Sequence, residues 1–266
     1  MKTVPPFERA AQLLFEAHGR RERFAPLPPE LAPQTAEQAY AIQDAFVALR
    51  AQELGAIVGY KIALTSEEMR RFVGVDVPQA GAMLERTLRR TPASVRAADY
   101  CRLLVEFEIA VELAGDLPAA DAPFSRERVA KAVGAVMPAL ELADDRNADY
   151  AELRKHPFEL IADNAWNEGA VLGYPIKQWQ DLDLGAARGV ATINGQVVGE
   201  GRGADAMGHP FNAVAWIADH LAAHGRGLLR GDVVITGSLI TTKFAQAGDL
   251  IRFAVDGLGE VELRVD

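Results

Sequence analysis

Residues 103–113, LLVEFEIAVEL, have the composition of a buried β-strand, yet carboxylates interrupt the run at positions 106, 108 and 112. Side chains alternate between the two faces of a strand, so Glu106 and Glu108 point the same way while Phe107 points to the opposite face. Burying an unpaired carboxylate is costly, so this pair needs either solvent or a counter-charge. Two interpretations stay open: an edge strand with one wet face, which also carries Glu112, or a pair that holds a divalent cation.

A third carboxylate completes the cation interpretation. Glu141 stands alone in the apolar run MPALELA (137–143), flanked by Leu140 and Leu142. Hard cations such as Mg²⁺ bind oxygen ligands, typically a few carboxylates together with water and substrate oxygens. Under this interpretation Glu106, Glu108 and Glu141 converge on one metal ion.

The first 75 residues are predicted to be mainly helical. Helices are expected over residues 7–18, with Ala10, Leu13, Leu14 and Ala17 at helical spacing, and from Thr35 to Gly55. A strand is expected at 57–63, followed by a short helix that Thr65 caps and Gly74 ends.

The remainder of the chain is predicted to be rich in strands. Besides 103–113, strands are expected at 168–174, in a hairpin at 190–201 with Asn194-Gly195 at its turn, and in the three closing segments 231–239, 248–256 and 259–266. Helices are expected after Ser125, over the segment ERVAKAVGAV that leads into 137–143, and at 211–223. The fold class is therefore α+β, with an N-terminal helical region (1–75) packed on a β-rich catalytic domain of mixed strands (76–266).

Composition excludes several classes of protein. The chain of 266 residues is 49% hydrophobic and 24% charged, with a net charge of −9 and one cysteine, Cys101. No apolar run approaches the roughly 20 residues that span a bilayer, and no dense basic block suits nucleic acid. We expect no signal peptide, no membrane contact and a cytoplasmic location. One cysteine excludes an intrachain disulfide and a cysteine-based zinc site.

Several motifs, in this order, carry a family resemblance. They are GYKIALTS (59–66), GVDVP (74–78), EFE (106–108), VMPALE (136–141), ADNA (162–165), GEGRGADAMGHPFNAVAWIA (199–218), GDVVITGSL (231–239) and AGDLIRFAVDGLGEV (247–261). The chain resembles the 2-keto-4-pentenoate hydratase family, within the fumarylacetoacetate-hydrolase-like superfamily. The resemblance implies that Glu106, Glu108 and Glu141 hold Mg²⁺ or Mn²⁺.

The resemblance also implies roles for polar residues outside the glutamates. Lys61 matches the family's active-site lysine, which would pair with a substrate carboxylate or developing enolate, or relay a proton. Asp163 and Asn164 would form a polar wall of the pocket, Asp163 as a catalytic group and Asn164 as a substrate contact. Ser238 would contact the substrate carboxylate. His209, which opens a helix, is interpreted as a structural cap residue.

Two positions depart from the family pattern. Gln79 stands where the hydratases usually carry an acid/base aspartate, and an amide can form hydrogen bonds but cannot take a proton. Trp166 stands where a small hydroxyl residue is expected. We therefore include Gln79 among the catalytic candidates and Trp166 among the substrate contacts, and we expect both to bear on the water-addition step and on the substrate's distal group.

The expected activity is that of a metal-dependent lyase, a hydratase that adds water to 2-hydroxy-2,4-dienoate or 2-oxo-alkenoate substrates in aromatic-compound degradation. The alternatives are a 2-oxo-3-enedioate decarboxylase of the same fold and a non-catalytic 2-oxo-acid binding homologue. The expected partners are a small 2-oxo acid, further copies of the chain in a homo-oligomer, and a decarboxylase of the same pathway.

Overall fold

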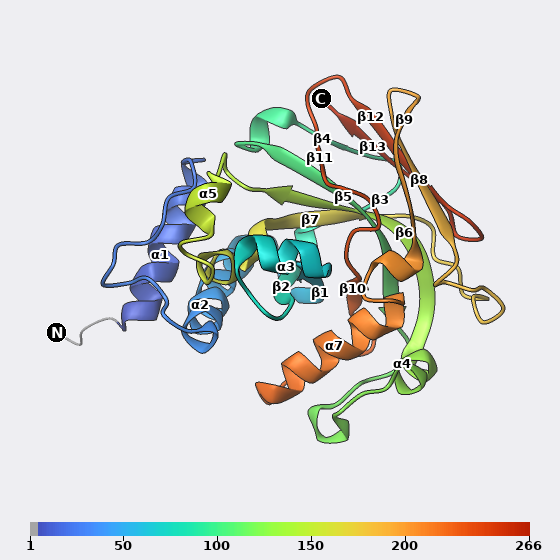
Figure 1. Cartoon of the computed structure of the whole chain (residues 1–266), viewed down its shortest axis with the longest axis horizontal. Coiled ribbons are helices and arrows are strands. Elements are labelled where there is room, and N and C mark those ends of the chain that lie inside the picture. The colour runs from blue at the N-terminus through green and yellow to red at the C-terminus, as the bar shows by residue number, and fades with distance from the viewer. Residues whose placement is uncertain (1–4) are drawn as a thin grey trace.

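Two β-sheets and a set of mostly peripheral helices make up the protein (Figure 1); the computed structural model describes residues 5–266. The helices are α1 (Pro6–Gly19), α2 (Ala36–Leu54), α3 (Glu67–Val73), α4 (Arg126–Ala132), α5 (Tyr150–Leu153), α6 (Glu159–Ala162) and α7 (Pro210–Ala223). The larger sheet contains β1 (Ile57–Ala63), β2 (Gln79–Leu84), β3 (Leu88–Arg90), β5 (Leu103–Leu113), β6 (Val133–Asp144), β7 (Asn167–Leu172), β10 (Val233–Ile235) and β11 (Lys243–Phe244). The smaller sheet contains β4 (Ala93–Val95), β8 (Arg188–Ile193), β9 (Gln196–Arg202), β12 (Leu250–Val255) and β13 (Gly259–Val265). The predicted α+β class is confirmed.

Strand β5, the stretch LLVEFEIAVEL, lies in the interior of the larger sheet. The strand order is β2-β1-β10-β5-β6-β7-β3, and β11 also pairs with β5. The edge-strand interpretation is therefore wrong, because β5 has partners on both sides. Its polar residues are not placed at a solvated sheet edge.

The register of the larger sheet places the predicted site residues on one face. Glu106 of β5 pairs with Glu141 of β6. On the other side of β5 lies β10, whose Ile235 pairs with Lys61 of β1. Lys61 in turn pairs with Gly81 of β2. Because directly paired residues point to the same side of a sheet, this site face carries both the lysine and the glutamates.

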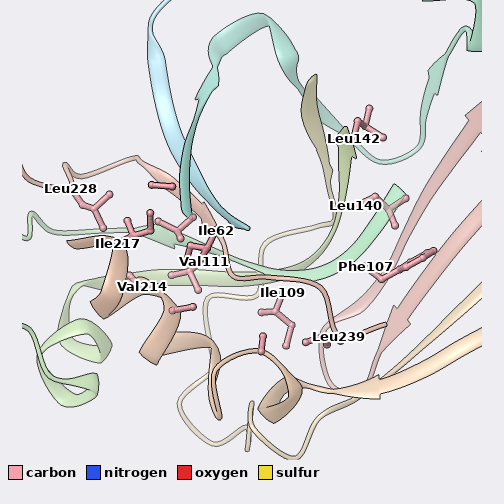
Figure 2. Packing of buried hydrophobic residues seen from close by; sticks show 14 of the residues in the cluster. Ile62, Phe107, Ile109, Val111, Leu140, Leu142, Val214, Ile217, Leu228 and Leu239 are labelled. Carbon is pink, nitrogen blue, oxygen red and sulfur yellow. The ribbon is translucent and has the colours of Figure 1, made fainter. Parts of the chain in front are cut away.

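The opposite face of β5 builds the main hydrophobic core. Phe107, Ile109 and Val111 alternate with the site-face residues and are fully buried. Figure 2 shows Val111 close to Val214 and Ile217 of α7, whereas Phe107 lies toward the other end of the cluster, where its ring centroid is 5.6 Å from that of Phe253 in the smaller sheet. Each such buried side chain stabilises the fold by roughly 1.5–3 kcal/mol relative to exposure. This packing holds the backbone that carries the two glutamates of β5.

The site face is enclosed because the larger sheet curls round on itself. Strand β2, at one end of the strand order, contacts β7, near the other end. The enclosed apolar positions form a cluster of their own, made of Met83, Ala110, Ala135, Met137, Ala139, Ala170, Leu172, Val233 and Ile235. The glutamates and Lys61 therefore lie inside the curl rather than on an open surface.

Three local predictions are corrected by the structure. The helix expected over ERVAKAVGAV ends at Ala132, because Val133 and the residues after it pair with β5 and extend strand β6. Ser66, not Thr65, caps α3 by accepting the Met69 amide. Leu13, expected on the buried face of α1, is 41% exposed.

The N-terminal helices are joined to the larger sheet by buried side-chain hydrogen bonds. The Gln43 amide donates to the carbonyls of Ala80 and Ile161, and the Tyr40 hydroxyl accepts the Ala80 amide. The strand within the predicted 1–75 region, β1, also pairs with two strands of that sheet. The boundary at residue 75 remains a prediction. Over residues 5–266, none of the helices has the length and apolar character needed to cross a bilayer.

Candidate active site

Three glutamate side chains meet inside the curl of the larger sheet. One carboxylate oxygen from each of Glu106, Glu108 and Glu141 lies within 4.8 Å of the other two. Glu108 and Glu141 are fully buried, whereas Glu106 is partly exposed. The structure thus brings together two sequence segments that are more than thirty residues apart, as the cation interpretation requires.

The two glutamates of β5 are held by the segment that follows β10. The Thr242 hydroxyl lies 2.8 Å from Glu106 Oε1, and the Gly237 amide donates to Glu108 Oε2 at 2.6 Å. Gly237 has φ +101°, and a Cβ there would lie 2.4 Å from the Thr65 side chain, so glycine suits this close approach.

Glu141 is held through one oxygen only. Its Oε1 accepts a hydrogen bond from Asn167 Nδ2 at 2.9 Å and lies 3.1 Å from the Lys61 ammonium. Its other oxygen, Oε2, is buried without a hydrogen-bond partner, and so is Oε1 of Glu108. Two unpartnered carboxylate oxygens within one cluster of three glutamates are a donor set suited to a hard divalent cation.

The electrostatics of the glutamates agree with that interpretation. Burial raises the pKa of Glu108 well above its ordinary value, and the neighbouring carboxylates of Glu141 and Glu106 raise it further. Burial likewise raises the pKa of Glu141, against the opposing effect of Lys61. Crowded buried carboxylates favour either a shared proton or a bound cation. The residues present therefore fit Mg²⁺ or Mn²⁺.

Lys61 is a buried cation beside this carboxylate cluster. Burial alone would lower its pKa, but the charges of Glu141, Glu106 and Glu108 outweigh burial and raise the pKa. Room for its stem comes from Gly81, where a Cβ would lie 3.0 Å from Lys61 Cγ and 2.8 Å from the Asn164 carbonyl oxygen. This arrangement favours a fixed ammonium over the predicted proton relay.

Gln79 is buried on the same face as Lys61, two residues from Gly81 along β2. Its Nε2 reaches the Pro157 carbonyl only at 3.4 Å, and its Oε1 has no hydrogen-bond partner. A buried amide oxygen without a partner can accept a hydrogen bond from a substrate or a water molecule. The geometry is compatible with the predicted role of Gln79 at the site.

Asp163 has both carboxylate oxygens occupied. Its Oδ1 lies 2.6 Å from His18 Nε2 of α1, and its Oδ2 accepts from Arg146 at 2.6 Å. Although burial opposes its charge, His18 and Arg146 lower the pKa of Asp163 to about 2. These contacts favour an anchoring role over the predicted catalytic one.

Asn164 and Ser238 make contacts that fix the backbone. The Asn164 side chain accepts the Ala82 amide at 2.7 Å and donates to the Ala82 carbonyl at 2.9 Å. The Ser238 hydroxyl accepts the Phe107 amide and donates to the Ile240 carbonyl. Both side chains are thus engaged by main-chain groups, which favours positioning roles over the predicted substrate contacts.

Trp166 lies in an aromatic and aliphatic cluster that adjoins the site face. Its ring packs edge-on against the rings of Phe24 and Tyr150, with distances between ring centroids of 5.7 Å and 6.0 Å. Its indole nitrogen is buried and has no hydrogen-bond partner among the described residues. The same cluster contains Leu104 and Ala143, two residues from Glu106 and Glu141 respectively and on their face of the sheet. Trp166 therefore lies where it can limit the distal end of a bound substrate.

The loop that carries these residues has an unusual backbone. Asn164, Ala165 and Trp166 have φ values of 51°, 48° and 59°, three left-handed residues in succession without a glycine. The left-handed conformation costs roughly 1–2 kcal/mol for an ordinary L-residue, less for asparagine. Asn167 follows directly and contacts Glu141, so the strained loop ends at the carboxylate cluster.

Sequence reasoning missed three residues that contact site groups. Asn167 and Thr242 hold glutamates, and His18 holds Asp163. Asn167 follows the ADNA motif by two residues, so its position was a usable signal. Nothing in the local pattern around His18 or Thr242 points to the site, since both reach it only through tertiary packing. His209 caps α7 by accepting the Phe211 amide, as predicted.

Fold and site together define an α+β protein whose acidic centre suits a divalent cation. Residues 53–266 match the fumarylacetoacetate (FAA) hydrolase C-terminal family, and the chain belongs to this family. It is 34% identical to a 2-keto-4-pentenoate hydratase of Paraburkholderia phymatum over 96% of this chain and 95% of that protein. It is 32% identical to a 2-hydroxyhexa-2,4-dienoate hydratase of Comamonas testosteroni over 97% and 96%.

A solved structure shares the whole architecture. The 4-oxalocrotonate decarboxylase from Pseudomonas putida G7, complexed with magnesium and adipate, superposes with a TM-score of 0.90 at 26% identity over 100% of both chains. The N-terminal helices are thus included in the structural likeness, although the family match begins at residue 53.

Proposed function

We propose that the protein is a metal-dependent hydratase, a carbon-oxygen lyase that adds water to a 2-hydroxy-2,4-dienoate or 2-oxo-alkenoate of aromatic-compound degradation. The main supporting observation is the trio Glu106, Glu108 and Glu141, in which the two fully buried members each have an unpartnered carboxylate oxygen and Glu141 contacts the Lys61 ammonium. The sequence relatives that match nearly the full chain are named as hydratases, which supports this reaction class.

The three glutamates would hold Mg²⁺ or Mn²⁺. When bound, such an ion supplies Lewis acidity toward the oxygens of a 2-oxo acid. The protein's own contribution begins with Lys61, whose ammonium binds the substrate carboxylate or the oxygen on which negative charge develops. The curled sheet excludes bulk water from these charges and strengthens their interactions.

Beyond the carboxylates, Gln79 and Trp166 would act on the rest of the substrate. The free Oε1 of Gln79 accepts a hydrogen bond and can orient the attacking water, but Gln79 cannot take the proton. The cluster around Trp166 is apolar and suits an alkyl or alkenyl tail. Asp163, Asn164 and Ser238 would keep the surrounding backbone in place.

A 2-oxo-3-enedioate decarboxylase is the second candidate. The observation that favours it is Gln79, because loss of CO₂ does not require a residue that deprotonates water. The structural likeness to the 4-oxalocrotonate decarboxylase is in line with this alternative.

The test measures both reactions on the same preparation. Purified protein with Mg²⁺ is incubated with 2-hydroxypenta-2,4-dienoate and, separately, with 2-oxo-3-hexenedioate, while ultraviolet absorbance and CO₂ release are followed. Loss of dienoate absorbance with formation of the 4-hydroxy-2-oxo acid is the expected result, and Glu106→Gln serves as the inactive control. CO₂ from the dioate without dienoate hydration would favour the decarboxylase. Mg²⁺ binding without turnover of either compound would identify a non-catalytic 2-oxo-acid binding protein.

The assembly is part of the proposal as well. We expect the chain to form a homo-oligomer in the cytoplasm and to associate with a decarboxylase of the same pathway. Light scattering of the purified protein, alone and mixed with that enzyme, measures both associations.

A further inference from the structure

One imidazole from the N-terminal helix bridges both ends of the strained loop. His18 Nε2 lies 2.6 Å from Asp163 Oδ1, and His18 Nδ1 lies 3.2 Å from Glu168 Oε1. Asp163 precedes the three left-handed residues, and Glu168 follows Asn167. The His18 side chain is 12% exposed and its ring packs against Phe46 of α2. It is therefore held rigidly between the two carboxylates.

Each carboxylate also binds an arginine. Arg146 binds Asp163, and Arg50 binds Glu168 through two nitrogens at 2.8 and 2.6 Å. The loop ends are thus tied by a chain of alternating charges, Arg146–Asp163–His18–Glu168–Arg50, in which Arg146 and Asp163 are buried and the other three side chains are 12–17% exposed. Alternating buried pairs of this kind define one geometry, because breaking any link leaves an unpaired buried charge.

The loop so clamped delivers Asn167 to the carboxylate cluster. Asn167 is adjacent to Glu168; its side-chain Nδ2 donates to Glu141 Oε1, and its side-chain Oδ1 accepts the Gly169 amide. A ligand's orientation depends on such supporting hydrogen bonds. Because the backbone at 164–166 is strained, the loop would relax away from this position if its ends were released.

We propose that His18 is a positioning residue that locks residues 163–168, the strained loop together with the first two residues of β7, and thereby sets the Glu141 carboxylate for cation binding. His18 does not touch the carboxylate cluster; it acts through Asn167. The inference rests on the proposed function in so far as Glu141 is a metal ligand. It makes α1, which precedes the family-matched part of the chain, a component of the site.

The test compares metal affinity and loop protection in four single variants and in the double variant His18→Ala/Asn167→Ala. His18→Ala removes the bridge, and His18→Gln keeps one hydrogen-bond donor in case the alanine variant folds poorly. Asn167→Ala cuts the link to Glu141 directly. Arg20→Ala, at the C-cap of the same helix and paired on the surface with Glu16 and Glu22, is the matched control. Mg²⁺ affinity is measured by calorimetry, and hydrogen exchange over 160–170 is measured on metal-free protein.

We expect Asn167→Ala to weaken Mg²⁺ binding roughly 10- to 100-fold, the usual effect of losing a group that supports a ligand, and His18→Ala roughly three- to tenfold. The double variant should bind no more weakly than Asn167→Ala alone, because both act on one path. His18→Ala should also speed exchange over 160–170. A cavity of about 300 Å³ is lined by His18, so added imidazole should restore part of the affinity of His18→Ala and leave Arg20→Ala unchanged.

Additive losses in the double variant would overturn the proposal, as would parent-like affinity and exchange in both His18 variants. If the His18 variants had a lower thermal stability but unchanged Mg²⁺ affinity and unchanged loop exchange, His18 would be a general stabilising residue. That result would also overturn the proposal. If the parent binds neither Mg²⁺ nor Mn²⁺, the proposed function is wrong, and the loop-exchange comparison alone then decides whether His18 locks the loop.

Discussion

A single amide-for-carboxylate change tests the metal assignment at the residue scale. Glu106→Gln keeps the size of the side chain and an oxygen that can accept from Thr242, but it removes one negative charge from the trio. We expect Mg²⁺ affinity to fall by at least tenfold, measured by calorimetry, with a parallel loss of turnover.

The matched control is Glu112→Gln, on the same strand and the same face but 37% exposed and near Arg90. That variant should keep the parent's affinity. Equal affinities in Glu106→Gln and the parent would remove Glu106 from the ligand set.

Lys61→Ala separates cation binding from chemistry. The ammonium lies 3.1 Å from Glu141, and its positive charge opposes a metal ion at the same cluster. Its removal should leave Mg²⁺ affinity unchanged or higher, while turnover falls on the order of 10²-fold through loss of charge stabilisation. Steady-state kinetics and calorimetry measure the two effects, with Lys243→Ala as control, since Lys243 pairs with Val105 on the opposite face. Full turnover in Lys61→Ala would exclude the lysine from the mechanism.

The charge chain around His18 gives stability a defined pH dependence. The pKa values of Asp163 and Glu168 are lowered to about 2 in the folded protein, whereas their pKa values in the unfolded chain are near 4. Their contributions to the free energy of unfolding are therefore complete above about pH 4 and are lost as the pH falls toward 2. The pKa of His18 is raised, because Asp163 and Glu168 outweigh its burial. The contribution of His18 to the free energy of unfolding is therefore complete below about pH 6.5 and is lost as the pH rises through the pKa of His18 in the folded protein.

Urea unfolding at a series of pH values tests this prediction. The free energy of unfolding should be highest between the acid range, where Asp163 and Glu168 are protonated, and the higher range, where His18 loses its proton. Glu159 is buried with its pKa raised from an ordinary value of 4.5 to about 7, so its ionisation lowers the free energy of unfolding as pH rises between these two values. His18→Gln isolates the histidine: the fall above pH 6.5 should be smaller in that variant. An identical fall in both proteins would assign it to other groups.

Among the secondary-structure elements, strand β5 has two faces with different roles: one packs in the core and stabilises the fold, and the other carries the carboxylates of the site. Phe107 is fully buried against the smaller sheet, while its neighbours in sequence face the carboxylate cluster. Phe107→Ala should lower the free energy of unfolding by about 3–5 kcal/mol, as is usual for emptying an aromatic core position. Urea unfolding measures the loss, and Mg²⁺ affinity of the folded variant should stay within about threefold of the parent. A large loss of affinity with little loss of stability would contradict this division of roles.

The alternation in LLVEFEIAVEL was sufficient to predict which residues share a face, because strand geometry fixes it locally. The strand itself and the hairpin around Asn194-Gly195 were predictable for the same reason. The end of α4 at Ala132 was not, since Val133 joins the sheet only through pairing with β5, which is a tertiary contact. The roles of Asp163 and Asn164 were likewise hidden, because their partners lie in α1, in the loop after β6 and in β2.

At the scale of the whole molecule, the family-matched part of the chain depends on the helices before it. Residues 5–54 supply His18 and Arg50 to the buried charge chain and Tyr40 and Gln43 to the backbone of β2 and α6. Removing them would leave Asp163 without one partner and Glu168 without two. An unpaired buried charge costs roughly 3–5 kcal/mol, a large share of a typical folding free energy of about 5–15 kcal/mol.

We therefore predict that a chain shortened to residues 55–266 does not form the native site. Near-ultraviolet circular dichroism should show the loss of fixed aromatic packing, and calorimetry should show no Mg²⁺ binding. The control is the shortened chain mixed with a peptide of residues 1–54, which supplies the missing side chains in trans and should restore part of both signals. A shortened chain that binds Mg²⁺ with the parent's affinity would show that the carboxylate cluster is set by the sheets alone, and that α1 and α2 only cover it.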